Sequence, residues 1–264
     1  MTHPFLHLPD EILLIIMSKI SNIDVLHSLM GTCEKLDRLA CDLVHTRSID
    51  LTETTSNDQI RPLSDEMLDR FCENILPRIH QNIECLTAES SSIHRIFQSI
   101  EYPKLFKLIL PELDLESVSQ YFNGKHSSLS EIQSMLFLEQ TSFIRICNEQ
   151  IFHAVLTVMD KSESASLSDV AMHLYLPIFN LLKSVTYLDF VIKDSFRYPP
   201  LSLDDFPPNA CFSSTIVHLS IKVMDLEDCL SLLDGRLNRL HTFIVEIHHI
   251  CPSTNDLANT VKPI

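Results

Sequence analysis

The sequence contains no tryptophan and only three glycines in 264 residues, and the shortage of glycine excludes several kinds of chemistry. Gly31, Gly124 and Gly235 lie far apart along the chain. A phosphate-binding loop, a dinucleotide fingerprint and the GxSxG elbow of many hydrolases each need two or more glycines at short spacing. The sequence therefore excludes the nucleotide-binding and hydrolase sites that are built on such loops.

Long apolar runs are also missing. The longest run near the start covers residues 12–17, whereas a membrane-spanning helix needs roughly 18 or more apolar residues. The first residues lack the basic and apolar segments of a secretory signal, and no Asn-x-Ser/Thr acceptor occurs. We therefore expect no membrane association and a cytoplasmic or nuclear location.

Positive charge is scarce. Lysine and arginine number 20 against 35 aspartate and glutamate residues, which gives a formal net charge of −15. Such a chain repels phosphate backbones, so we do not expect a nucleic acid partner.

The eight cysteines include no CxxC pair and are typical of reduced, buried thiols.

Residues that could support metal binding or catalysis are present but poorly placed. Four possible zinc ligands lie near the C-terminal end: His241, His248, His249 and Cys251. His248 and His249 would point to opposite faces of a strand, and no second ligand pair has zinc-finger spacing. Cys33 and Cys147 lie in apolar helical stretches, which favours packed thiols over nucleophiles. We predict no metal, no cofactor, no catalytic residue and no enzymatic activity.

The N-terminal segment predicts a helix that is apolar on more than one side. Pro9 suits the first helical position, and the acidic residues after it suit the positive end of the helix dipole. One stripe contains Ile12, Leu13, Ile16 and Ile20, but Leu14, Ile15 and Met17 add further apolar sides. Two shorter helical stretches follow by residue 42, and a unit of this size does not usually stabilise its own core. The first helix is therefore expected to bind a second apolar surface.

This segment resembles an F-box domain over residues 8 to about 48. The resemblance depends on Leu8-Pro9-x-Glu11-Ile12-Leu13, on apolar Ile16 and Ile20, on Asp24-Val25-Leu26, and on Leu29, Cys33 and Leu36. It implies that a Skp-type adaptor binds here and connects the chain to a cullin ubiquitin ligase. The partner-binding residues that it implies are Leu8, Pro9, Glu11, Ile12, Leu13, Ile16, Ile20, Val25, Leu26, Leu29, Cys33 and Leu36.

After residue 48 an LxxLxL-like phrase recurs six times. It starts at Ile83, Leu105, Ile151, Val185, Ile216 and Leu240. Each phrase predicts a strand with alternate side chains buried, and helices are expected near residues 92–100, 115–122, 168–182 and 225–233. The long interval between the second and third phrases predicts a degenerate repeat near residues 129–138.

This pattern resembles an irregular leucine-rich-repeat solenoid, in which short strands stack into a parallel sheet. The predicted fold class is α/β. The predicted domains are an F-box at 5–48, a linker and lead-in helix at 49–75, a solenoid at 76–250 and a tail at 251–264. Residues 52–62 are the expected linker, and residues 193–213 are an expected proline-rich insertion.

The main functional hypothesis is a substrate-recognition subunit of an SCF-type cullin ubiquitin ligase. The solenoid would hold an unidentified target protein, and the net negative charge favours a basic one. Its candidate recognition residues are Glu84, Lys107, Asp189, Ser220 and Glu246. The alternative is a repeat-protein scaffold whose F-box-like start only caps the solenoid, and the missing tryptophan in the third helix fits that alternative.

Overall fold

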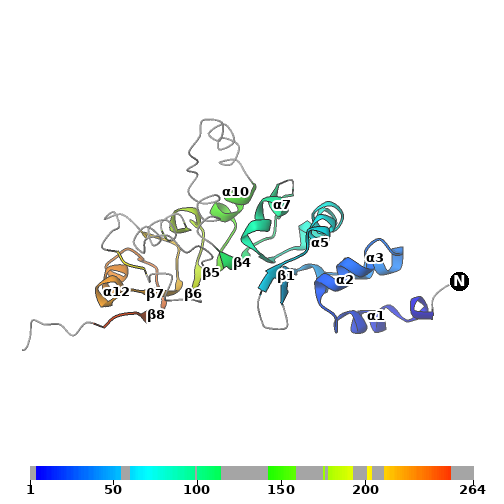
Figure 1. The fold of residues 1–264 in the computed structure, drawn as a ribbon, viewed down its shortest axis with the longest axis horizontal. Helices are drawn as coiled ribbons and strands as arrows, with labels where there is room; N and C mark the ends of the chain where they lie inside the picture. The colour runs from blue at the N-terminus through cyan, green and yellow to red at the C-terminus, as the bar shows by residue number, and fades with distance from the viewer. Residues whose placement is uncertain are drawn as a thin grey trace, which may run out of the picture.

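A computed structural model describes residues 4–54, 60–98, 100–113, 142–158, 175, 178–192, 201–203 and 211–250. Within these residues the protein is mixed α/β, which confirms the predicted class. Figure 1 shows a helical N-terminal region at one end of an elongated molecule, followed along its length by one sheet. Among the described helices none is long and apolar enough to cross a lipid bilayer.

The N-terminal region consists of short helices. They are η1 (Pro4–His7), α1 (Asp10–Met17), α2 (Asn22–Leu29), α3 (Glu34–Ala40) and α4 (Leu43–Thr46). The Ser21 hydroxyl accepts a hydrogen bond from the Asp24 backbone N–H and so caps α2. Gly31 adopts a φ of +85°, a left-handed conformation that glycine tolerates, in the turn before α3. The three predicted helices are present, whereas α4 is too short to give a periodic pattern.

The sheet has eight strands in the order β2-β1-β3-β4-β5-β6-β7-β8. The strands are β1 (Ser48–Thr54), β2 (Ile60–Pro62), β3 (Cys85–Ala88), β4 (Lys107–Leu113), β5 (His153–Val158), β6 (Tyr187–Ile192), β7 (His218–Val223) and β8 (Thr242–Ile247). From β1 to β8 every neighbouring pair is parallel, and β2 alone runs antiparallel to β1. All six strands predicted from the repeated phrase are confirmed.

The expected linker at residues 52–62 is wrong at both of its ends. Thr52 pairs with Pro62 and Thr54 pairs with Ile60, so these residues extend the sheet instead of separating two domains. The first strand of the sheet is therefore β1, which precedes the first strand that the repeated phrase predicts. Only Ile49 and Leu51 are buried in it, and two alternating apolar residues before a polar run are too weak a pattern to predict a strand.

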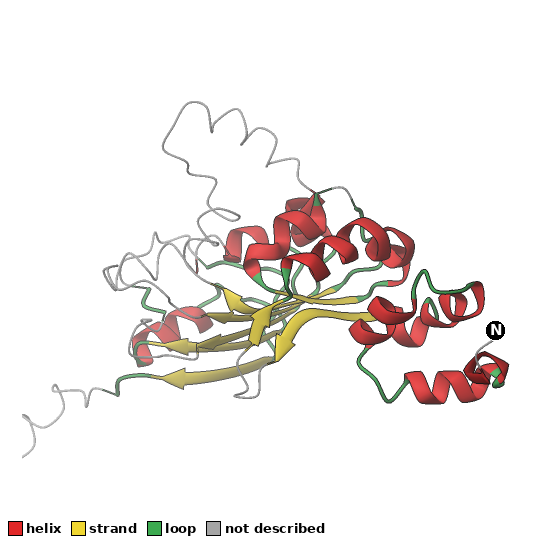
Figure 2. Ribbon diagram, turned by 45° about the vertical axis from the view of Figure 1, so that its right-hand side comes forward, coloured by secondary structure: helices red, strands yellow, loops and turns green. Residues whose placement is uncertain are grey.

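The helices between strands lie on one side of the sheet, as Figure 2 shows. They are α5 (Asp65–Arg70), the π-helical turn η2 (Phe71–Ile75), α6 (Leu76–Ile79), η3 (His80–Asn82), η4 (Ser90–Ser92), α7 (Ile93–Phe97), α10 (Ser142–Glu149) and α12 (Leu226–Leu233). The predicted helices at 92–100 and 225–233, and the lead-in helix before β3, are confirmed. Residues 178–181 are helical within the predicted 168–182.

Several predicted features lie outside the described residues. They are the helix at 115–122, the degenerate repeat at 129–138, most of the insertion at 193–213 and the tail at 251–264.

The core runs without interruption from the N-terminal helices through the sheet. Residues such as Leu86, Leu108, Leu188 and Leu219 occupy equivalent register positions and are at most 2% exposed. Buried residues of α1 to α3 belong to the same cluster. The N-terminal helices and the sheet are therefore one packed body.

Candidate functional site

Exposed apolar side chains cover one face of α1 and the turn after it. Ile12, Ile15, Ile16 and Ile20 remain 43%, 57%, 37% and 46% exposed. We refer to these four residues as the α1 face. Leu13 and Met17 of the same helix are buried, so α1 has one apolar side in the core and a second in solvent. A helix with two apolar sides fits the prediction that another surface covers it.

Basic residues of α3 fasten the start of α1. The Lys35 ammonium donates to the backbone carbonyls of Leu6 and Leu8, at 3.1 and 2.7 Å. Arg38 and Lys35 also pair with Asp10, at 2.6 and 3.3 Å, and these contacts lower the pKa of the Asp10 carboxyl. Lys35 and Arg38 therefore hold the start of α1 in place through contacts with Leu6, Leu8 and Asp10.

The predicted partner-binding residues divide between surface and core. Pro9, Glu11, Ile12, Ile16 and Ile20 are exposed. Leu8, Leu29 and Cys33 are half-buried, whereas Leu13, Val25, Leu26 and Leu36 are buried. The structure therefore brings the α1 residues together on one surface, and it places the four buried ones in the core beneath that surface.

Polar contacts join the N-terminal helices to the first strand. Asn22 at the start of α2 donates through Nδ2 to the Ser48 carbonyl at 3.1 Å. Its Oδ1 lies 3.2 Å from Nδ1 of His45, a side chain that is 1% exposed. Asn82 donates to the Thr46 hydroxyl at 3.3 Å. Asn22 and Asn82 are half-buried and His45 is buried, and these contacts hold the N-terminal helices against β1 and η3.

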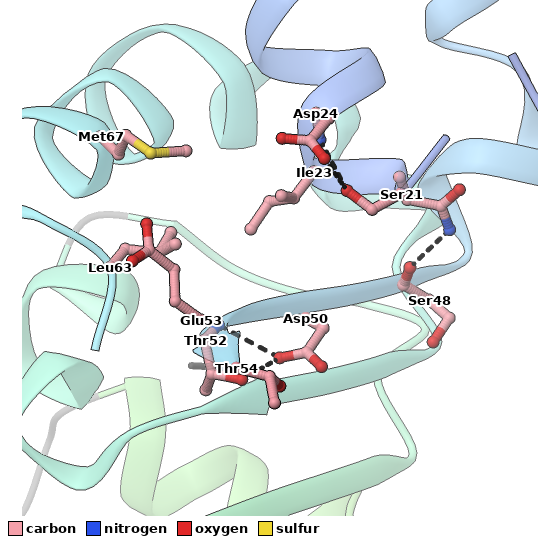
Figure 3. A pocket seen from close by; sticks show the side chains of 11 residues that line it. Ser21, Ile23, Asp24, Ser48, Asp50, Thr52, Glu53, Thr54, Leu63 and Met67 are labelled. Carbon is pink, nitrogen blue, oxygen red and sulfur yellow. Dashed lines mark hydrogen bonds between the residues drawn. The ribbon is translucent and has the colours of Figure 1, made fainter. Parts of the chain in front are cut away.

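A pocket of about 570 Å³ lies at this joint, between the start of α2, the strand β1, and Leu63 and Met67 at the start of α5 (Figure 3). Three carboxylates line it, those of Asp24, Asp50 and Glu53, and no lysine or arginine is among the described residues that line it. Asp24 accepts from the Ser21 hydroxyl, and Asp50 accepts from the Thr52 backbone and hydroxyl groups. The pocket therefore adds negative charge at the β1 end of the sheet.

The side of the sheet that faces away from the helices carries polar and aromatic side chains. One row of equivalent register positions across it contains Cys85, Lys107, His153, Tyr187, His218 and Thr242, each half-buried. The next row contains Thr87, Ile109, Val155, Asp189, Ser220 and Ile244. We refer to these two rows, with Ser48 and Asp50 on β1 and Lys222 and Glu246 on β7 and β8, as the open face.

Three rings stack side by side in the middle of the open face. The ring centroids of His153 and Tyr187 lie 4.0 Å apart, and those of Tyr187 and His218 also lie 4.0 Å apart. Burial lowers the pKa of His153, the positive charge of Lys107 lowers it further, and Asp189 acts in the opposite direction. The His153 ring therefore binds a proton less readily than a free histidine side chain does. We refer to these three residues as the ring ladder.

Of the five predicted recognition residues, four lie on the open face. Lys107, Asp189 and Ser220 lie in its two rows, and Glu246 pairs with Lys222 at 2.5 Å. Glu84 is different, since it precedes β3 and pairs with Arg47 at 3.3 Å.

The candidate thiols and metal ligands show no assembled catalytic or metal centre in the described part of the chain. No three histidine, cysteine or acidic side chains there are placed to share a metal ion. The His248 and His249 rings contact each other edge to face, while Cys251 lies outside the described residues. Cys147 is fully buried, and burial raises the pKa of its thiol, whereas Cys33 is half-buried.

Sequence reasoning missed Ile15 and the ring ladder as candidate site residues. Ile15 lay outside the predicted stripe, and only the packing of Leu13 and Met17 shows which side of α1 is free. The ladder has a readable signal, because His153, Tyr187 and His218 each occupy the third position of the repeated phrase. Alignment of the phrases one above another would have placed them in one row.

Comparisons with known proteins do not supply an assignment. No protein-family model matches the chain, and a search of curated proteins finds no relative. The α1 face and the open face are therefore the features of the protein that bear on its function.

Proposed function

We propose that this protein is the substrate-recognition subunit of an SCF-type cullin ubiquitin ligase. In this proposal α1 to α3 form an F-box that binds a Skp-type adaptor, and the parallel strands form a leucine-rich-repeat-like solenoid that binds a target protein. The protein would catalyse nothing itself and would act by holding the target near the ubiquitin donor.

The observation that carries the proposal is the α1 face. Exposure of four isoleucines on one face costs free energy in water. A partner protein that covers them would gain about 25 cal/mol per Å² of apolar area buried. They lie directly after the Leu8-Pro9-x-Glu11 start that resembles an F-box. Ile12 and Ile15 remain 43% and 57% exposed, so packing within the described chain leaves them available to a partner.

The test is co-purification of the full chain with a Skp-type adaptor. The informative variant is Ile12→Asp with Ile16→Asp, because both side chains are exposed, so the new carboxylates can reach water. The matched control is Leu230→Asp on α12, a residue that is 57% exposed on a different helix. We expect a stoichiometric complex with the native chain and the control, and at least a hundredfold weaker binding with the double variant.

A native chain that stays soluble and alone would overturn the proposal in favour of the scaffold alternative. Equal loss of the adaptor in the α1 variant and in the α12 control would also overturn it, since binding would then not depend on the α1 face. Circular dichroism melting curves of all three proteins show whether any loss reflects unfolding.

A further inference from the structure

The last repeat of the sheet is uncovered on its outer side. β8 is the final strand in the sheet order, and Figure 1 shows β8 and α12 at the end of the molecule opposite the N-terminal helices. Three apolar side chains of β8 occupy core positions but are only half-buried: Phe243, Val245 and Ile247. Their register partners on β7 are at most 3% exposed: Leu219, Ile221 and Val223. Neighbouring strands therefore shield these positions on β7, whereas no described strand shields the outer side of β8.

One flank of α12 is also apolar and exposed. Leu226, Leu230 and Leu233 are 53%, 57% and 53% exposed. At about 100° per residue the three leucines lie within about 60° of one another, and the buried Cys229 and Leu232 point to another side of the helix. We refer to this flank, together with Phe243, Val245 and Ile247, as the end surface.

The free edge of β8 also offers backbone groups for pairing. His248, just after β8, donates its backbone N–H to Val223 of β7 at 3.0 Å. Because alternate residues of a strand direct their backbone groups to opposite sides, those of Phe243, Val245 and Ile247 point away from β7. Among the described residues no backbone group bonds to them from that side. An edge of this kind is a template for another strand.

We propose that the end surface binds a second copy of this protein, with the two β8 strands antiparallel about a twofold axis at Val245. This inference goes beyond the proposed function and does not depend on it. In this register Val245 lies opposite its own counterpart, and Phe243 lies opposite Ile247 of the second copy, so apolar side chains meet on the helix side of the sheet. The free backbone groups of all three residues pair across the axis, and the same axis brings the exposed flanks of the two α12 helices toward each other.

A second copy fits this surface better than a charged partner does. Glu246 is the one charged residue of β8, and it lies on the open face and pairs with Lys222. The end surface therefore has no charge for a basic or acidic partner to bind, and no unpaired charge that keeps another strand away. The six residues of β8 span about 20 Å, and β8 and α12 together are about 20 Å deep, so the footprint is about 400 Å² per copy. Two copies then bury accessible area on the order of 1,000 Å², which suits a weak, reversible dimer.

The test is sedimentation velocity of the full chain at a series of micromolar concentrations. We expect a reversible monomer–dimer equilibrium without larger species, because a twofold interface is fully occupied once two copies have met. We also expect the dimer to become at least threefold stronger when the salt concentration rises from about 0.05 M to about 0.5 M, because salt screens the repulsion between two chains of net charge −15. Salt would weaken a contact between opposite charges instead.

Two variants disrupt the contact at separate places. Leu230→Asp puts a carboxylate on the exposed flank of α12, and Val245→Pro removes a backbone N–H that points away from β7, a change that edge strands tolerate. We expect each variant to weaken the dimer at least tenfold. The matched control is Leu43→Asp on α4, a leucine that is 48% exposed in the N-terminal region, and we expect a change below twofold. Circular dichroism melting curves show whether each variant is folded.

A disulfide bond locates the twofold axis. Opposite residues of a hydrogen-bonded antiparallel pair have Cα atoms about 5.5 Å apart, so Val245→Cys should cross-link two copies under mild oxidation. The control is Ile244→Cys, because the two copies of this residue lie about 8 Å apart across the diagonal, beyond the reach of a disulfide. We expect peptide mass spectrometry to find the symmetric link in Val245→Cys and not in Ile244→Cys.

A chain that stays monomeric at every concentration would overturn the proposal, as would a loss with Leu43→Asp as large as that with Leu230→Asp. Symmetric cross-linking of Ile244→Cys as strong as that of Val245→Cys would also overturn it, since the strands would then meet in another register. Adaptor binding is measured separately on the same proteins. A chain that dimerises without binding the adaptor overturns the ligase assignment alone, whereas one that binds the adaptor but never dimerises overturns the twofold contact alone.

Discussion

Substituting Asn22 with alanine should loosen the joint between the N-terminal helices and the sheet. In the native protein the Asn22 amide bridges the Ser48 carbonyl and the His45 ring. Ser48 is exposed, so water can replace the lost bond to its carbonyl at a cost of about 0.5 to 1.5 kcal/mol. His45 is 1% exposed, so its Nδ1–H would lose its acceptor without gaining water, which costs about 1 to 3 kcal/mol.

The free energy of unfolding should therefore fall by about 1.5 to 4.5 kcal/mol in Asn22→Ala. Urea titration followed by circular dichroism measures it. The control is Asn238→Ala, an exposed asparagine between α12 and β8, which should change stability by less than about 0.5 kcal/mol. A loss below 1 kcal/mol in Asn22→Ala would refute the claim that this amide holds the joint.

The same joint should make the protein sensitive to acid. Burial lowers the pKa of His45, with Asp42 acting in the opposite direction, so the folded state binds a proton less readily than the unfolded chain. Stability is then unaffected above the unfolded histidine pKa of about 6.5 and falls as the pH drops below it, by at most about 1.4 kcal/mol per pH unit from this group. In Asn22→Asp a carboxylate would face the ring and favour its protonation, so the acid loss should shrink. An unchanged slope in Asn22→Asp would contradict the assignment to His45.

Three further predictions concern single contacts. Lys35→Met removes the ammonium that fastens the start of α1 and should weaken adaptor binding about three- to tenfold, as isothermal titration calorimetry would show. Asp228→Ala removes the acceptor of the Leu203 backbone N–H, at 2.6 Å in a buried site, and should cost about 1 to 3 kcal/mol in urea titration. An equal loss in Asp228→Asn, which keeps an oxygen there, would show that charge matters more than the hydrogen bond. Iodoacetamide should label Cys33 at least a hundredfold faster than Cys147 in the native protein, and equal rates in peptide mass spectrometry would contradict the burial of Cys147.

The strands could be predicted because each repeated phrase carries its own period-two signal. Leu108, Leu188 and Leu219 alternate with half-buried residues, and the alternation is visible in the sequence without any tertiary information. β1 could not be predicted, because only Ile49 and Leu51 alternate and the strand owes its place to pairing with β3.

The candidate site was only partly predictable, and the reason differs between the two surfaces. On α1 apolar residues occupy both sides, so the pattern indicates that two surfaces are covered but not which side faces the core. The packing of Leu13 against the rest of the chain decides that, and it leaves Ile12 and Ile15 outside. On the sheet, Tyr187 and His218 meet through strand register, which depends on how the long connections between strands close.

The continuous core bears directly on how such a receptor would work. Each parallel strand lies about 4.8 Å from the next, so β6 with Tyr187 lies four steps, about 19 Å, from β1. The Asn22 bridge and the shared core hold β1 against α2, so a target bound on the open face would stay at a fixed distance and angle from a partner on the α1 face. If proximity is the source of rate, loosening the joint in Asn22→Ala should slow ubiquitin transfer more than it weakens either binding event. A variant that binds both partners with native affinity and transfers at the native rate would show that this rigidity has no part in the function.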